Sequence, residues 1–353
     1  MVLAPKKIFF VDLAKTLGII LIVFTHLNQN FHFFNALYLT YQKKELFFVL
    51  ERMAYVAGHV GVSLFIVASG FGLTYSLLNK TNPNWKKWLI KKIIRIYPLF
   101  WLSFSAFFSL SIVNSWWRHG YLVFPIGKKE LITTLLGVQA YFGYWGGHLN
   151  PVYWFLSLIL ALYLIFPFLY LLLKKRPRLS LVLLFFLSLA TGLPLLNHSM
   201  EVFRFIFIPH LFEFYSGMFL VFWYQKRLST KKQSWHGLFS LGLFIAIFII
   251  YYLLKQNYLT VLLVITAGPL LFFTFYSWEN PNRNHYWQYL VEKLAKYSFA
   301  VFLFHLPLIN LHQLLKPSPI FLLFYFPLVG IVSFMGNFII EKITPRIQKL
   351  LLP

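Results

Sequence analysis

The sequence contains no cysteine and very little negative charge. The absence of cysteine excludes a disulfide framework, a thiolate nucleophile, and any zinc or iron–sulfur site that needs thiolate ligands. Only 9 Asp and Glu stand against 32 Lys and Arg, and charged residues make up 12% of the 353 positions. That is about half the ~25% expected of a soluble domain, so the chain lacks the charge that covers a water-exposed surface.

The sequence is instead rich in apolar and aromatic residues. Hydrophobic residues make up 59% of it and aromatic residues 21%, and its mean hydropathy is +0.69. No soluble core hides that much apolar surface, because most residues of a globular protein touch its surface. We therefore expect an all-α polytopic membrane bundle. This excludes a secreted enzyme, a cytosolic dinucleotide-binding enzyme and a disordered scaffold.

The net charge of +23 would indicate nucleic-acid binding in a soluble protein. Here the basic residues gather in short loops between apolar runs, which is typical of a membrane protein oriented by its positive loops. The expected partner of this charge is therefore an anionic lipid surface, and no nucleic acid.

Apolar runs of about 20 residues predict about ten transmembrane helices. The predicted spans are 8–27, 54–78, 96–113, 152–173, 179–196, 203–224, 236–254, 258–277, 297–314 and 319–340. With a cytoplasmic N-terminus, 22 of the 32 Lys and Arg fall on the cytoplasmic side, which predicts that both termini are cytoplasmic. An eleventh span at 131–149 would spoil this asymmetry, so we interpret that glycine-rich stretch as re-entrant or interfacial. No linker or internal repeat interrupts the chain, and residues 1–353 are predicted to form a single membrane domain.

Ionisable residues within the predicted spans are functional candidates, because a charge at bilayer depth costs on the order of a few kcal/mol. Lys15 and His26 lie eleven residues apart in the first span. That spacing is close to three helical turns, so both side chains face the same way, about 16 Å apart along the axis. Two interpretations stay open. Either the pair serves a function, or Lys15 snorkels to the interface and His26 is an interfacial residue.

Three further polar residues lie late in the chain. Glu213 follows His210 by three residues, which lets the two pair on one helix face, where Glu213 either orients a base or binds a cation. Arg204, at the outer end of the same predicted helix, either binds an anionic glycan or lipid head group or snorkels. His305 precedes a Leu-Pro pair and is either functional or a hydrogen-bonded structural residue.

Several sequence motifs occur in an order known from one family. Lys15–x10–His26 resembles the Arg–x10–His pattern of the first helix of acyltransferase-3 proteins, a family of integral membrane acyltransferases. The other similar motifs are the run 61–71 with Ser69 and Gly70, Lys91-Lys92 with Arg95 and Pro98, Trp154–Ser157 with Pro167, Glu213-Phe214 with Gly217, and Tyr297-Ser298 with His305 and Pro307. Ten spans is also the topology that this resemblance implies.

The sequence departs from the family pattern at four positions. Lys15 replaces the usual Arg, which turns a bidentate phosphate contact into a point charge. Ser63 stands where many members have Asp. Ile159 and Leu160 replace acidic residues of one large branch, which places the chain nearer to the branch that resembles polysaccharide O-acetylases and succinylases.

The resemblance implies transfer of a short acyl group, expected to be acetyl, from cytosolic acyl-CoA to a hydroxyl of an extracytoplasmic or lipid-linked polysaccharide. His26 is the expected general base, because histidine has an unperturbed pKa of about 6.5. The remaining catalytic candidates are Glu213 and His305. The residues expected to hold the phosphates of the donor are Lys15, Lys91, Lys92 and Arg95, although Lys91 and Lys92 are equally typical of topology signals.

Ser69, Trp154 and Arg204 are the candidates for contact with the acceptor, although Ser69 in its small-residue stretch is also typical of helix packing. We expect no resident cofactor or metal, with acyl-CoA as donor substrate, and a glycan synthase as a further candidate partner besides the glycan and membrane lipids. The expected location is a bacterial plasma membrane. The alternative function is a membrane exporter of a cell-surface polysaccharide.

Overall fold

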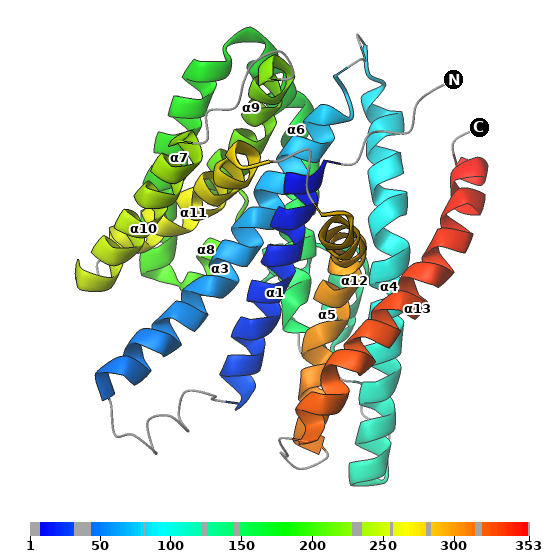
Figure 1. Cartoon of the computed structure of the whole chain (residues 1–353). Helices are drawn as coiled ribbons and strands as arrows, with labels where there is room; N and C mark the ends of the chain where they lie inside the picture. The colour runs from blue at the N-terminus through cyan, green and yellow to red at the C-terminus, as the bar shows by residue number, and fades with distance from the viewer. Residues whose placement is uncertain are drawn as a thin grey trace. The chain divides into compact units, whose positions relative to one another are not determined.

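The computed structural model describes residues 8–31, 44–78, 80, 82–121, 124, 126–144, 149–227, 235–254, 257–279, 284–314 and 320–351. Within these ranges every regular element is a helix (Figure 1). Eight of the described helices are long and apolar enough to cross a membrane. The chain is therefore an all-α, multi-pass membrane protein.

The elements follow one another along the chain as named in Figure 1. They are α1 (Phe9–Phe31), α3 (Lys44–Tyr75), α4 (Trp85–His119), α5 (Lys128–Leu135), η1 (Gln139–Phe142), η2 (Pro151–Tyr153), α6 (Trp154–Lys175), α7 (Pro177–His198), α8 (Met200–Phe205), η3 (Ile208–His210), α9 (Leu211–Arg227), α10 (Trp235–Leu254), α11 (Asn257–Ser277), α12 (His285–Leu314) and α13 (Ile320–Leu351).

Eight of the ten predicted spans coincide with helices that meet the criteria of length and apolarity. The predicted span 297–314 lies within α12, and the predicted span 203–224 is divided among α8, η3 and α9. The described part of 131–149 contains α5 and η1, of 8 and 4 residues, which are too short to cross a bilayer. Residues 145–148 of that stretch lie outside the described residues.

The chain divides into two compact units. Unit 1 consists of residues 1–81 and 165–298, and unit 2 of residues 82–164 and 299–353. Two helices, α6 and α12, run unbroken from one unit into the other, so neither unit is a continuous segment of sequence.

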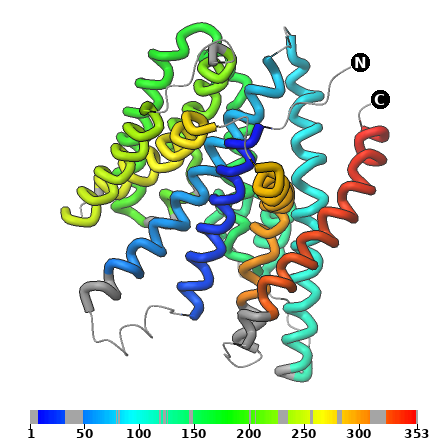
Figure 2. Tube along the Cα trace, viewed as in Figure 1, coloured from blue at the N-terminus to red at the C-terminus, as the bar shows by residue number. Residues whose placement is uncertain are grey.

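Helix α3 is the central element of unit 1, and it packs against α1, α9 and α11 (Figure 2). Its contact with α1 depends on two glycines. A Cβ added to Gly61 would lie 2.5 Å from the carbonyl oxygen of Gly18, and one added to Gly18 would lie 2.9 Å from the carbonyl oxygen of Gly61. The two backbones therefore touch at a point where no larger side chain fits.

The contact of α3 with α9 is closer still. A Cβ on Gly70 would lie 2.0 Å from the carbonyl oxygen of Phe214, and one on Gly217 would lie 2.0 Å from that of Val67. Gly70 and Gly217 thus face each other across the crossing. Gly61 and Gly70 are nine residues apart, which is two and a half turns, so α1 and α9 pack on opposite faces of α3.

Helix α11 meets α3 at Ser63, one of the positions where the sequence departs from the family pattern. The backbone N–H of Gly268 donates to Ser63 Oγ at 3.2 Å, and a Cβ on Gly268 would clash with the same serine. Ser63 therefore serves a helix contact in this chain, and the small hydroxyl fits where an aspartate would need more room.

A proline within α12 of unit 2 leaves one backbone carbonyl for side chains to bond. Pro307 lacks an N–H, so the carbonyl of Leu303 loses its helical donor. Asn150 Nδ2 donates to that carbonyl at 2.9 Å, and Ser103 Oγ donates to it at 3.3 Å. Ser103 also shares a 2.9 Å hydrogen bond with the hydroxyl of Tyr153. Side chains of α4 and of the turn before α6 thus replace the missing backbone bond.

A second backbone contact of unit 2 follows α5. Gly137 has φ +70°, a left-handed conformation that favours glycine, and its carbonyl accepts a 2.8 Å bond from Ser157 Oγ. Ser157 belongs to the Trp154–Ser157 motif, so this motif anchors the short segment beside α6.

Candidate functional site

The helix expected over 203–224 is broken in the structure at residues 206–210. Helix α8 ends at Phe205, and α9 begins only at Leu211, after the single turn η3 that contains Pro209. Ser188 of α7 satisfies backbone groups at the break, because its Oγ accepts from the N–H of Phe212 at 3.2 Å and donates to the carbonyl of Ile208 at 3.4 Å. The prediction of one continuous span was wrong here, because Pro209 supplies no N–H to the ladder and Ser188 bonds to the backbone groups on either side of the break.

His210 and Glu213 pair across this break, as their spacing predicted. His210 Nδ1 lies 2.5 Å from Glu213 Oε2, and the two residues are 2% and 0% exposed. The imidazole also packs against the ring of Phe203, with centroids 5.5 Å apart. At this degree of burial, the two side chains are shielded from solvent and depend on each other and on the surrounding protein for polar contacts.

The far atoms of this pair are left without partners. His210 Nε2 and Glu213 Oε1 are both buried, and neither has a hydrogen-bond partner. A buried polar atom without a partner costs about 1–3 kcal/mol, so each such atom needs a physical explanation.

Arg204 lies on α8, just before the break, and bonds to two residues of α3. Its guanidinium donates to the hydroxyl of Tyr55 at 3.0 Å and to Nε2 of His59 at 3.3 Å. Its Nε is buried without a partner. His59 is also within electrostatic range of His210. We call these five residues, Tyr55, His59, Arg204, His210 and Glu213, the Arg204 cluster.

The sequence identifies Arg204 and Glu213 as site candidates and His59 as a histidine near the outer end of its span, but it does not predict the contacts of Arg204 with Tyr55 and His59. Tyr55 and His59 are separated from Arg204 by 149 and 145 positions. No local spacing links residues that far apart, and only the packing of α8 and α9 against α3 brings them together. The sequence offers only a weaker indication of a shared site: His59, Arg204 and Glu213 each lie in an apolar run.

Lys15 and His26 both lie on α1, which is unbroken from Phe9 to Phe31. Lys15 Nζ is 3.7 Å from Asp12 Oδ1, and both side chains are partly exposed. His26 is half-buried, and its carbonyl accepts from Asn30. Thr25 donates to the carbonyl of Ala54, so this end of α1 lies against the first half of α3.

The predicted site residues of unit 1 discussed so far lie on three helices. Lys15 and His26 lie on α1, Arg204 on α8 and Glu213 on α9. The contacts of Arg204 on α3 adjoin those of this end of α1, because Arg204 bonds to Tyr55 and His59 and Thr25 contacts Ala54 and Gly58. Ser69 is half-buried beside Gly70 at the α3–α9 crossing, a position that fits the packing interpretation.

The predicted donor-binding residues of α4 belong to unit 2. Lys91 and Arg95 are exposed and lie one turn apart on α4. Lys92 is half-buried, with its Nζ 5.7 Å from the ring centroid of Trp88. Trp154 begins α6, is half-buried, and meets Phe155 edge-on with centroids 6.0 Å apart.

His305 is completely buried in α12, and its Nδ1 bonds to its own helix. The carbonyl oxygens of Val301 and Phe302 lie 3.0 Å and 2.9 Å from it. Tyr325 of α13 donates to the carbonyl of His305 at 3.3 Å. These backbone bonds favour the hydrogen-bonded structural role, the second of the two interpretations that the sequence left open.

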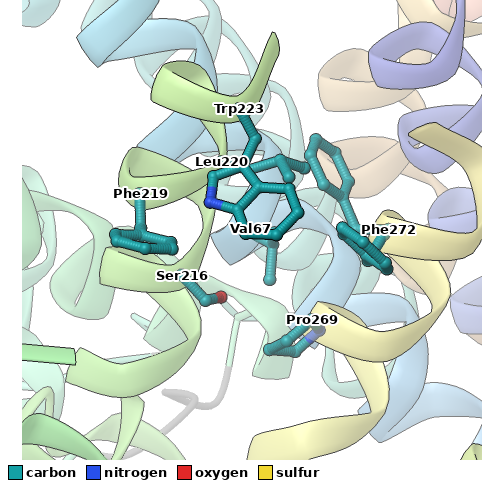
Figure 3. A pocket seen from close by; sticks show the side chains of 8 residues that line it. Val67, Ser216, Phe219, Leu220, Trp223, Pro269 and Phe272 are labelled. Carbon is teal, nitrogen blue, oxygen red and sulfur yellow. The ribbon is translucent and has the colours of Figure 1, made fainter. Parts of the chain in front are cut away.

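An apolar cavity of about 280 Å³ lies in unit 1 beside the α3–α9 crossing (Figure 3). Its lining consists of Val67, Ser216, Phe219, Leu220, Trp223, Pro269, Phe272 and Phe273. Ser216 is the one residue that brings a hydroxyl to it, and that hydroxyl donates to the carbonyl of Glu213 at 2.7 Å. The cavity thus lies one helical turn from the Arg204 cluster along α9.

The chemistry that these groups offer is acid–base and electrostatic. Within the part of the chain that the structure describes, no three His, Asp or Glu residues are arranged to hold a metal ion. A histidine, a carboxylate and a guanidinium in an apolar environment are suited to proton transfer and to the binding of oxyanions.

Comparison with known proteins gives one match. The acyltransferase-3 family model, described as an acyltransferase domain, matches residues 8–342. Neither a curated protein nor a solved structure matches the chain. The family match covers both units and every site residue discussed above.

Proposed function

Because this chain belongs to the acyltransferase-3 family, we propose that it transfers an acetyl group from cytosolic acyl-CoA to a hydroxyl of an extracytoplasmic or lipid-linked polysaccharide. Family membership and the eight apolar helices make it a membrane acyltransferase. The donor, the acyl group, the acceptor and the catalytic base are the parts that we add.

In this proposal His26 is the general base. Its imidazole accepts the proton of the acceptor hydroxyl while the hydroxyl oxygen attacks the thioester carbonyl carbon. The C–S bond then breaks, its electron pair leaves with sulfur, and the thiolate of CoA takes up a proton. The observation that carries the proposal is the unbroken helix α1, which keeps Lys15 and His26 on one face in a membrane-spanning segment.

The donor is anionic, so the proposal assigns its phosphates to basic side chains. Lys15 on α1, and Lys91, Lys92 and Arg95 on α4, supply positive charge for phosphate contacts. Glu213, through its pair with His210, is the further catalytic residue of the proposal. The burial and side-chain pairing of Glu213 support its role, whereas the backbone bonds of His305 support a structural contribution.

The test is the ester-linked acyl content of cell-envelope glycans. Cells that carry the intact protein are compared with cells that carry His26→Ala at matched membrane level. Loss of a general base typically lowers the rate about 10²–10⁴-fold, so we expect the ester to disappear while the amount of glycan stays unchanged.

His198→Ala is the matched control, because His198 is an exposed histidine at the end of α7. Normal ester content in His26→Ala would remove His26 as the base. Unchanged ester together with missing surface glycan would favour the exporter and contradict the proposal.

A further inference from the structure

The Arg204 cluster contains a positive charge that the described contacts do not neutralise. Among the described residues, Arg204 bonds to the Tyr55 hydroxyl and the His59 imidazole, and both are neutral acceptors here because a guanidinium only donates. The carboxylate of Glu213 bonds to His210 instead. A cation in an apolar environment is costly unless an anion accompanies it.

The His210–Glu213 pair does not change this balance. An ionised carboxylate accepts and never donates, so Nδ1 of His210 carries the proton of their shared bond. The buried charge of Glu213 is compensated when His210 carries protons on both nitrogens. The pair is then neutral as a whole, and His210 Nε2 becomes a donor.

Three unpartnered atoms thus remain in the cluster. They are the N–H donor at Arg204 Nε, the ring nitrogen Nε2 of His210, which donates when the ring carries both protons, and one acceptor, Glu213 Oε1. His59 bonds to Arg204, and Phe203, which precedes Arg204 on α8, packs against the ring of His210 with centroids 5.5 Å apart. His210 and Glu213 are each more than nine-tenths buried, so bulk water does not satisfy these atoms.

We propose that Arg204 and His210 bind the anionic group of the acyl acceptor, and that Glu213 accepts a hydroxyl of the same sugar. The ligand class is an acidic sugar unit: its carboxylate or phosphate accepts the two donors and neutralises Arg204, and its neighbouring hydroxyl donates to Glu213. This inference rests on the proposed function, because it names the acceptor as anionic.

The position of the cluster is consistent with a binding role separate from the base. His26 lies on α1, whereas Arg204, His210 and Glu213 belong to α8, η3 and α9. An acceptor larger than one sugar can place its reacting hydroxyl at one location and its charge at the other.

The first experiment measures binding without any acyl transfer. The purified full chain in nanodiscs of neutral lipid is heated with glucose, glucuronate or glucose 1-phosphate at matched ionic strength. We expect the midpoint of unfolding to rise with one or both anionic sugars and not with glucose. A response to glucuronate alone identifies a carboxylate of an acidic polysaccharide, and a response to glucose 1-phosphate alone identifies the phosphate of a lipid-linked glycan.

The variants locate that binding. Arg204→Gln removes the rise, and Arg204→Lys keeps only part of it, because an ammonium lacks the planar fork of donors. Arg52→Gln is the matched control: Arg52 Nε is already satisfied by the hydroxyl of Tyr251 at 3.1 Å, so its loss leaves the rise intact. Where Arg204→Gln does not fold, Arg204→Lys and His210→Gln carry the test.

The second experiment measures transfer from acetyl-CoA to the same three sugars. We expect the ratio of kcat/KM for the preferred anionic sugar over glucose to fall at least tenfold in Arg204→Gln, mainly through KM. Equal stabilisation by glucose, or a full anion response in Arg204→Gln, overturns the inference. Anion binding without transfer to any acceptor leaves the site standing and rejects the proposed function instead.

Discussion

One buried polar cluster in each unit satisfies its groups in a different way. In unit 2, Asn150 and Ser103 donate to the carbonyl of Leu303, and His305 bonds to carbonyls of its own helix. In unit 1, the residues of the Arg204 cluster bond to one another's side chains. Polar groups that bond to the backbone hold a helix in shape, whereas side chains that bond only to side chains leave atoms available for a ligand.

The buried histidines His305 and His210 differ in the partners of their ring nitrogens. His305 Nδ1 faces two carbonyl oxygens that a helix supplies without any further side chain. His210 needs Glu213 to hold its Nδ1, and its Nε2 remains unpartnered. Burial alone therefore does not identify a functional histidine. The partner of each ring nitrogen does, and this explains why the sequence left both interpretations of His305 open.

The largest effect is expected where the side-chain network of unit 1 is broken. Glu213→Ala leaves His210 without its buried partner charge, which costs about 3–5 kcal/mol of unfolding free energy. Glu213→Gln keeps the shape and should cost less. Chemical unfolding in micelles, followed by tryptophan fluorescence, measures both. A cost of Glu213→Ala below about 1 kcal/mol would contradict the view that this pair is a compensated charge.

A second prediction concerns the crossing that encloses the cluster. Gly70→Ala places a Cβ 2.0 Å from the carbonyl oxygen of Phe214, so α3 and α9 must separate. Overpacking of this kind typically costs about 1–3 kcal/mol. Gly72→Ala is the control on the same helix, because a Cβ at Gly72 meets nothing within 4 Å. Since alanine is the better helix former, Gly72→Ala should be neutral or slightly stabilising. Equal losses in the two variants would rule out the close crossing.

A third prediction tests the backbone role of unit 2. Asn150→Leu removes the stronger of the two donors to the carbonyl of Leu303, at an expected cost of about 1–2 kcal/mol. In a Pro307→Ala background the restored N–H of residue 307 bonds to that carbonyl, so the same substitution should cost less. A double-mutant cycle measures the coupling. Additive effects would mean that Asn150 does not replace the missing backbone bond.

The smallest effect is expected at Gln139 of unit 2, whose side chain does not bond to the backbone as Asn150 and Ser103 do. Both amide atoms of this fully buried side chain are unpartnered. Replacing an unsatisfied buried amide with an apolar group of similar size removes a desolvation cost, so Gln139→Leu should be neutral or stabilising by about 1 kcal/mol. A stable variant with lost acyl transfer would instead place a ligand in unit 2 and weaken the contrast between the units.

The parts of the site that sequence predicted are those encoded locally. The His210–Glu213 pair follows from a spacing of three residues, and the shared face of Lys15 and His26 follows from helix geometry. Pro209 is visible in the sequence as a possible helix break, but the apolar run around it favoured the prediction of a continuous helix.

Contacts between distant segments could not be predicted in the same way. Arg204 meets Tyr55 and His59 only because the α3–α9 crossing aligns them, and that crossing depends on which glycines face each other. Pro307 predicts a carbonyl at Leu303 without its helical donor, but nothing in the sequence indicates that Asn150 donates to it. Packing between helices far apart in sequence supplies this information.

The Gly70–Gly217 contact also has a consequence for the order in which the protein is made. Residue 217 is synthesised about 150 residues after residue 70, which at 5–20 residues per second is a wait of roughly 7–30 s. Of the three helices that pack against α3, only α1 has been made by then. The partner of Glu213 needs no such wait, because His210 leaves the ribosome just before it. The partners of Arg204, in contrast, are made 149 and 145 residues earlier.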